Sequence, residues 1–359
     1  MLRVDTERRF FLRFKVEGGF QSEFTPIVRR RTYQMVQETR MNSSLKRLDQ
    51  EPKRLIMIGG KGGVGKSTCA SAIALHFAIQ GKKTLIISSD PTPSLSDIFE
   101  TEIGDQETPI KGVQNLYGIE ISSDVVLKKW KERFGPEIYE VVSSFASVDY
   151  DFVEYIGGAP GIEEEYMLNY ILELVESGQY DLVVWDTAPA GHTLRLLHLP
   201  QIFLRHLEAA TKFYMNLYSY FEKFKESVKL KKGKRTLLEI ISGWENLAEK
   251  VVNFIRDTQK TDFIIVTIPE ALGVRQTERI IQDFDEYQLR VNHLIINYVI
   301  QEADCEFHRL RKEMQQSYIK ILKDQYSSRI RLIELPLLSH EIRGVERIGK
   351  ISEILFKQE

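Results

Sequence analysis

The fold is decided by residues 55–68, which read LIMIGGKGGVGKST. The first four residues form a short apolar run, which is typical of a buried strand, and a helix-like segment runs on from Lys66 to Gln80. Between them the pattern G-x-x-x-x-G-K-[S/T] places glycines where backbone N–H groups can surround a phosphate, and a lysine where it balances the phosphate charge. A strand, a glycine-rich loop and a helix in this order predict a P-loop.

The residues of this loop have separate expected roles. We expect Lys66 to neutralise the β- and γ-phosphates of a nucleotide, and the hydroxyl of Ser67 to bind magnesium. Lys61 is a second lysine inside the loop, and two interpretations stay open for it: contact with a phosphate, or exposure to solvent, as is common for loop lysines. The expected nucleotide-binding residues of the loop are Gly60, Lys61, Gly62, Gly63, Val64, Gly65, Lys66, Ser67 and Thr68.

The pattern of a buried strand followed by a helix recurs along the chain. Apolar runs of strand length occupy residues 84–88, 116–121, 182–185, 263–267, 294–297 and 330–333. Strands that are apolar throughout and separated by helical segments are typical of a parallel sheet covered on both faces. The sequence therefore predicts an α/β fold, a P-loop NTPase with a mainly parallel sheet flanked by helices.

The remaining segments define the expected domains. Residues 124–177 and 201–257 look helical throughout, and both stretches are too long for simple crossovers. They predict a helical subdomain inserted into the sheet domain. Residues 1–50 are rich in lysine and arginine and lack a regular apolar period, so we expect a poorly ordered N-terminal extension, with Met41 as an alternative start. The ATPase domain then consists of residues 51–123, 178–200 and 258–359.

Composition narrows the class of protein. The formal net charge is −2, so there is no electrostatic reason to expect nucleic acid as the main partner. Two cysteines, Cys69 and Cys305, exclude a disulfide framework and suit a reducing cytosol. We find no apolar run long enough to span a membrane. We therefore expect a cytoplasmic protein that reaches a membrane through a partner.

Two aspartates follow predicted strands at the edge of the sheet where ligands of open α/β sheets collect. Asp90 follows the run 84–88, and Asp186 follows the run 182–185. We expect Asp186 to hold magnesium through water and Asp90 to polarise the attacking water as a catalytic residue. The alternative for each is an aspartate that caps a helix.

With Lys61 included, the loop KGGVGKST resembles the deviant P-loop of the partition, septum-site, nitrogenase-iron-protein and arsenical-pump ATPases. In that group the extra lysine reaches across a dimer interface to the phosphates bound by the other subunit. The resemblance implies a magnesium-dependent ATPase that works as a homodimer, with Lys61 as a catalytic residue in trans, in the manner of an arginine finger.

Further blocks resemble one branch of that superfamily, the arsenical-pump ATPases and the guided-entry ATPases for tail-anchored membrane proteins. The segment ending at Glu270 looks like the A-loop of the family, whose glutamate contacts nucleotide near the dimer seam. Asn297 matches the asparagine that recognises adenine, and the segment that begins at Pro336 matches one that lies against the base. The resemblance covers the chain from about Arg54 to its end.

The two activities of this branch are associated with different sequence features. The bacterial arsenical-pump subunit is a tandem of two ATPase halves with metalloid-binding cysteines, whereas this chain has one P-loop and two cysteines. The targeting ATPases usually hold zinc between subunits with a C-x-x-C motif from each. Here Cys305 and His308 stand at that place, which implies a Cys2His2 zinc site shared by two subunits, unless neither residue binds metal.

The resemblance implies three functions. The first is an ATPase that binds hydrophobic tail anchors in an apolar groove of the helical subdomain and delivers them to a membrane receptor. Aromatic residues at 203–221 and apolar residues at 168–175 are candidates for that groove, with a role in the core as the alternative. The second is a subunit that drives an arsenite or antimonite permease, and the third is a partition-type ATPase. Metalloid-stimulated hydrolysis would distinguish the second function, and DNA-stimulated hydrolysis the third.

Overall fold

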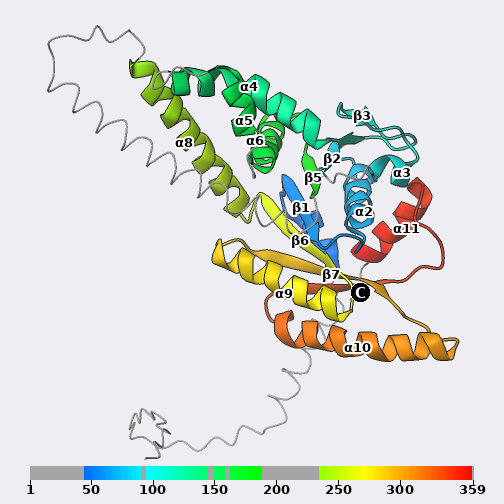
Figure 1. Ribbon diagram of the computed structural model, residues 1–359. Helices are drawn as coiled ribbons and strands as arrows, with labels where there is room; N and C mark the ends of the chain where they lie inside the picture. Colours follow the sequence, from blue (N-terminus) through cyan, green and yellow to red (C-terminus); the bar gives the residue numbers. More distant parts are fainter. Residues whose placement is uncertain (1–43, 90–93, 144–148, 158–161, 188–233, 358–359) are drawn as a thin grey trace, which may run out of the picture. The chain divides into compact units, whose positions relative to one another are not determined.

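The computed structural model describes residues 44–89, 94–143, 149–157, 162–187 and 234–357 (Figure 1). Asp90 and the aromatic segment 203–221 lie outside these residues. Most of the expected N-terminal extension does so too, but its last residues form the 3-10 helix η1 (Leu45–Gln50), with Leu45 and Leu48 fully buried. The expectation that residues 1–50 are poorly ordered throughout was therefore wrong for this short segment, because two leucines fix it to the core.

Within the described residues the strands form one eight-stranded sheet with the order β3-β4-β2-β5-β1-β6-β7-β8. All neighbouring strands pair in parallel except β3, which pairs antiparallel with β4. The expected mainly parallel sheet is confirmed. The strands are β1 (Leu55–Gly60), β2 (Thr84–Ser88), β3 (Thr108–Pro109), β4 (Leu116–Glu120), β5 (Leu182–Asp186), β6 (Thr261–Thr267), β7 (Val291–Val299) and β8 (Arg331–Pro336).

Helices cover both faces of the sheet (Figure 1). Side chains of the central strands alternate between two cores: in β1, Leu55 and Met57 belong to one, and Ile56 and Ile58 to the other. Residues of η1, α2 (Lys66–Ile79), α3 (Leu95–Phe99) and α11 (Val345–Phe356) pack in the second core. Residues of the first core come from α4 (Ser123–Ser143), α6 (Ile162–Glu176), α8 (Lys234–Arg256), α9 (Ala271–Glu286) and α10 (Glu306–Tyr326), while α5 (Asp151–Gly157) adjoins α4.

Helix α6 decides between the two interpretations of residues 168–175. Leu168, Ile171, Leu172 and Val175 are all buried, between 1% and 7% exposed, in the same core as strands β1, β2 and β5. These residues are therefore part of the core, and the interpretation of this segment as a client groove was wrong. Their apolar spacing reflects contact with the sheet.

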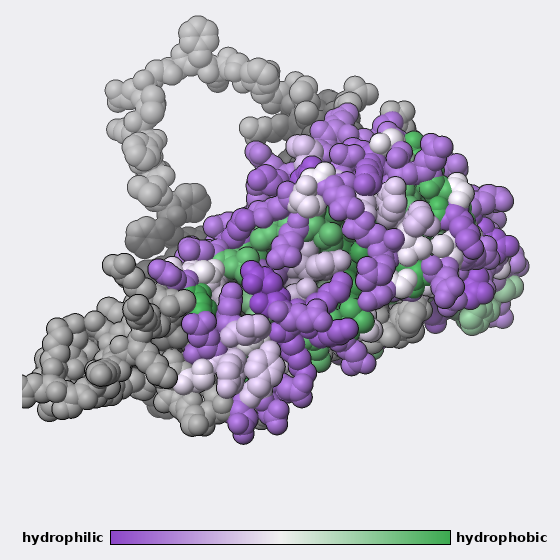
Figure 2. Space-filling view, turned by 90° about the horizontal axis from the view of Figure 1, so that it is seen from above, coloured by the Kyte–Doolittle hydropathy of each residue, from purple (hydrophilic) through white to green (hydrophobic). Residues whose placement is uncertain are grey.

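Because most apolar residues lie in the two cores, a largely hydrophilic surface is expected. The face shown in Figure 2 is mostly hydrophilic, with hydrophobic residues visible between hydrophilic ones. In the part of the chain that the structure describes, no helix is long and apolar enough to cross a membrane.

Candidate nucleotide-binding site

The predicted P-loop connects β1 to α2 in a backbone conformation that requires glycine. Gly60, Gly63 and Gly65 have φ angles of 146°, 78° and 91°, which side-chain-bearing residues rarely adopt. A Cβ atom on Gly60 would lie 2.3 Å from the carbonyl oxygen of Val266. The loop is thus held tightly against the end of β6.

The two lysines of the loop differ in their surroundings. Lys66 is 4% exposed at the first position of α2, and its Nζ donates a 3.5 Å hydrogen bond to the carbonyl oxygen of Lys61. Lys61 itself is half-buried. Lys66 therefore lies within the curl of the loop at a helix N-terminus, where a nucleotide phosphate would be bound.

The expected magnesium residues lie in contact with each other. The Ser67 hydroxyl donates a 2.6 Å hydrogen bond to Oδ2 of Asp186, and the Ser88 hydroxyl lies 3.3 Å from the same oxygen. Asp186 is fully buried at the end of β5, beside the P-loop strand β1. Hydroxyl and carboxylate oxygens are hard ligands of the kind magnesium prefers, so this pair fits the expected site.

Asn297 supports the P-loop from the neighbouring part of the sheet. Its Nδ2 donates a 2.9 Å hydrogen bond to the carbonyl oxygen of Val64, and its Oδ1 accepts from the backbone N–H of Tyr298 at 2.8 Å. A Cβ atom on Gly65 would lie 2.4 Å from the same amide nitrogen. The structure thus gives this residue a contact with the loop that sequence reasoning missed, beside its expected contact with adenine.

A small cavity of about 200 Å³ lies beside this contact. Glu270 lines it at the N-terminus of α9, where its carboxylate forms an ion pair with Arg311. Leu337, which follows Pro336 at the end of β8, also lines it and is 50% exposed. The structure therefore brings the three expected nucleotide-contacting segments, those of Glu270, Asn297 and Pro336, to one place, since Glu270, Tyr298 and Leu337 line the same cavity.

Tyr298 is a residue of this cavity that sequence reasoning missed. It lies in the left-handed region at a φ of 60°, is 40% exposed, and lines the cavity next to Asn297. Burial and, to a smaller extent, Cys69 raise the pKa of its phenol, so the hydroxyl stays protonated at neutral pH. Only its position next to Asn297 could have identified it in the sequence.

Comparisons with known proteins identify the family. A family model described as anion-transporting ATPase matches residues 53–357. This chain belongs to the anion-transporting ATPase family.

Its relatives match over most of their length. The chain is 34% identical over 315 residues to a protein named ATPase ASNA1 homolog 1 from Paramecium tetraurelia, which covers 86% of this chain and 94% of the relative. It is 31% identical over 317 residues to ATPase get3 from Pyrenophora tritici-repentis, covering 86% and 93%. An ATPase ASNA1 homolog from Dictyostelium discoideum is 32% identical over 315 residues, covering 86% and 92%. The chain is an ATPase of this family.

A second group of side chains that can bind a metal ion lies at the start of α10 in this anion-transporting ATPase. Ligand atoms of Asp304, Cys305 and His308 lie within 4.8 Å of one another, and Cys305 is exposed. The hydrogen bond from His308 is the main cause that lowers the pKa of Asp304. Thiolate, imidazole and carboxylate are all zinc ligands, so the residues present fit a zinc ion that would replace the contact between His308 and Asp304.

Proposed function

We propose that this ATPase is a homodimeric targeting factor that binds the hydrophobic tail anchors of membrane proteins and delivers them to a membrane receptor. The observation that carries this proposal is the match, over 86% of the chain, with ATPases named get3 and ASNA1 homolog. A single P-loop and the sequence blocks shared with the guided-entry branch support it. We place the protein in the cytoplasm, with membrane contact through its receptor and no nucleic acid as partner.

Nucleotide binding follows from the geometry of the loop. Backbone N–H groups of residues 60–68 and the ammonium group of Lys66 bind the β- and γ-phosphates. Magnesium, held by Ser67 directly and by Asp186 through water, would neutralise phosphate charge. Glu270, Asn297 and the segment at Pro336 surround the adenosine, with Tyr298 in the wall of the same cavity.

Hydrolysis transfers the γ-phosphoryl group to water. Asp90 hydrogen-bonds the attacking water and orients it toward the γ-phosphorus. As the new oxygen–phosphorus bond forms, the bond from the γ-phosphorus to the bridging oxygen breaks, ADP leaves with the bridging oxygen, and a proton of the attacking water passes to an oxygen of the released phosphate. Lys61 of the other subunit balances the charge on the transferred group, so the reaction depends on the dimer.

The client site belongs to the helical subdomain formed by residues 124–177 and 201–257. ATP closes the dimer and completes an apolar groove, and hydrolysis opens it. Because α6 buries its apolar side chains in the core, the groove depends on other residues of this subdomain, with 203–221 as the first candidates. At the dimer seam, Cys305 and His308 of each subunit hold one zinc ion.

Co-expression with a tagged C-terminal transmembrane segment tests this function. The chain as given and Asp90→Asn should both retain the segment in a soluble complex, and Asp90→Asn should retain more because hydrolysis follows loading. A matched segment with leucines changed to serine should be lost. If neither protein captures the apolar segment, the targeting function is wrong, and metalloid-stimulated hydrolysis then tests a permease-driving role.

A further inference from the structure

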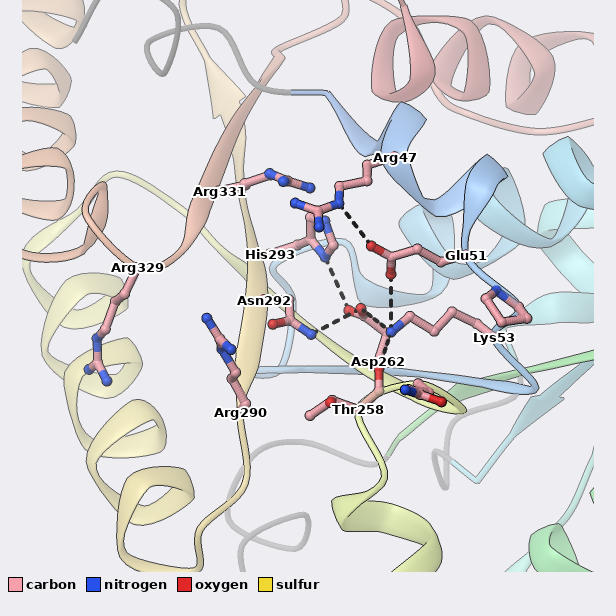
Figure 3. Close-up of a pocket in the computed structure, with 12 residues that line it drawn as sticks. Arg47, Glu51, Lys53, Thr258, Asp262, Arg290, Asn292, His293, Arg329 and Arg331 are labelled. Atoms are coloured by element: carbon pink, nitrogen blue, oxygen red, sulfur yellow. Dashed lines mark hydrogen bonds and ion pairs between the residues drawn. The ribbon is translucent and has the colours of Figure 1, made fainter. Parts of the chain in front are cut away.

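A second cavity, of about 570 Å³, is lined by the residues drawn in Figure 3. It lies at the opposite end of the sheet from the P-loop. Asp262, His293 and Arg331 line it near the first residues of β6, β7 and β8, whereas the nucleotide site lies at the far ends of these parallel strands. None of the nucleotide-binding residues contributes to it. Its volume falls in the range of small-molecule sites, roughly 300–1,000 Å³.

The cavity is rich in positive charge. Four arginines and one lysine line it, against two carboxylates, those of Glu51 and Asp262. Lys53 lies 3.1 Å from Glu51 and 3.5 Å from Asp262, and Arg47 lies 3.0 Å from Glu51, so both carboxylates are already paired. In the part of the chain that the structure describes, Arg290 has no ion pair. Cationic side chains in the wall therefore outnumber the carboxylates that could balance them.

Arg331 carries the strongest sign of a missing counter-charge. It is half-buried, its guanidinium points toward that of Arg47, and it has no carboxylate partner within ion-pair distance among the described residues (Figure 3). Burial and then Arg47 lower the pKa of Arg331, against smaller opposing effects of Glu51 and Asp262. A guanidinium nevertheless stays charged, so an anion between these two arginines would relieve their repulsion.

His293 adds an unpartnered polar atom to the same wall. The side chain is buried, and its Nδ1 lies 3.1 Å from Oδ1 of Asp262. Its Nε2 is buried without a hydrogen-bond partner among the described residues. Because a carboxylate only accepts, Nδ1 carries the proton of the contact with Asp262.

We propose that this cavity is a second anion site, which binds a small phosphate-bearing ligand through Arg331, Arg290 and Arg47. Guanidinium groups match phosphate oxygens with paired, charge-assisted hydrogen bonds. Among the described residues, Arg290 and Arg331 are the two cations of the wall without an ion pair, and one phosphate group is enough to balance their charge. A cavity of this volume fits a small molecule.

Titration calorimetry with pyrophosphate, without magnesium, tests the proposal. The full-length chain carries Lys66→Ala, which weakens phosphate binding at the P-loop. In this background we expect one pyrophosphate per chain, and about tenfold weaker binding when Arg331→Gln or Arg290→Gln is added. Arg133→Gln is the control at an exposed arginine of α4 outside the cavity, and it should leave the affinity unchanged.

Two results would overturn the second anion site: no pyrophosphate binding to the Lys66→Ala chain, or equal affinity in the arginine variants and the control. Arg290 is exposed, so Arg290→Gln decides the matter even if Arg331→Gln fails to fold. Sedimentation with phosphatidylcholine vesicles, with and without phosphatidylinositol bisphosphate, then separates the sources of the ligand. Binding that depends on Arg290 and on the phosphorylated lipid assigns a headgroup, and pyrophosphate binding without vesicle binding assigns a soluble ligand.

Discussion

The hydroxyl of Ser67 donates a 2.6 Å hydrogen bond to the carboxylate of Asp186, although the two residues are 119 positions apart in the sequence. The contact exists because β1 and β5 are neighbours in the sheet, so that the helix after β1 begins beside the end of β5. It places a hydroxyl and a carboxylate where a magnesium ion bound to nucleotide phosphates would lie.

Asp186→Asn tests the role of this carboxylate. The amide keeps the shape of the side chain and can still accept the Ser67 hydrogen bond, but it removes the negative charge. We expect ATP hydrolysis to fall by about two orders of magnitude or more, while nucleotide binding without magnesium persists. Steady-state hydrolysis and fluorescence titration with a labelled nucleotide measure the two quantities. An unchanged hydrolysis rate would exclude Asp186 as a magnesium residue.

Gly65 and Gly81 form a matched pair for the P-loop. Both have a φ of 91°. A Cβ atom added to Gly65 would lie 2.4 Å from the side-chain nitrogen of Asn297, whereas a Cβ atom added to Gly81 would meet open space. We expect Gly81→Ala to cost only the left-handed backbone penalty, about 1 kcal/mol of unfolding free energy. Gly65→Ala should cost more and abolish ATP binding. Urea unfolding and nucleotide titration check this, and equal effects of the two substitutions would contradict it.

Asn297→Ala removes the side-chain amide that donates a hydrogen bond to the carbonyl oxygen of Val64. Both residues are buried, so this carbonyl oxygen would be left without that partner. The expected loss of unfolding free energy is about 1–3 kcal/mol. ATP affinity should fall as well, because the loop loses its support. Asn297→Asp should be no better, since a carboxylate cannot donate this hydrogen bond. Full ATP affinity in either variant would show that the contact does not support the loop.

Tyr298 should contribute to binding of the base. Tyr298→Ala removes a ring from the wall of the small cavity, so KM for ATP should rise while kcat changes little. Tyr298→Phe keeps the ring and should stay near the original KM. A fall in kcat with unchanged KM in Tyr298→Ala would place the residue outside the nucleotide-binding surface.

The two cysteines should differ in reactivity. Burial is the main cause that raises the pKa of the Cys69 thiol to about 12, so this group stays a neutral, unreactive thiol until strongly alkaline pH. Cys305 is exposed. A thiol reagent at neutral pH should therefore label one cysteine per folded chain, and Cys305→Ser should abolish labelling. Protection of Cys305 by added zinc would support the proposed metal site, and labelling of Cys69 in the folded chain would contradict the account of its burial.

The sheet was largely predictable from the sequence. Buried parallel strands are apolar throughout, so β1, β2, β5 and the strands after them are visible as runs. Strand β3 was missed because it has two residues, Thr108 and Pro109, at the edge of the sheet. The role of α6 was not predictable, because an apolar helix face has the same residue spacing whether it lines a groove or packs in a core. Only the strands packed against α6 show that its residues belong to the core.

The site was predictable only in part. The spacing of the P-loop identified Lys66 and Ser67, because that motif is local. The hydrogen bond from Asn297 to Val64 joins residues 233 positions apart, so only the folded sheet reveals it. The cavity at Arg331 was missed for the same reason, since its arginines come from η1, from the residue before β7, and from the turn before β8 and the start of that strand.

The most direct test of the whole account is nucleotide-dependent capture of a fluorescent transmembrane peptide by the purified chain. With a non-hydrolysable ATP analogue, the unaltered chain should bind the peptide, because the closed dimer completes the groove. Lys66→Ala, which weakens phosphate binding, should bind little in the same assay. Equal capture by both proteins, or capture by neither, would contradict a targeting ATPase whose P-loop controls its client site.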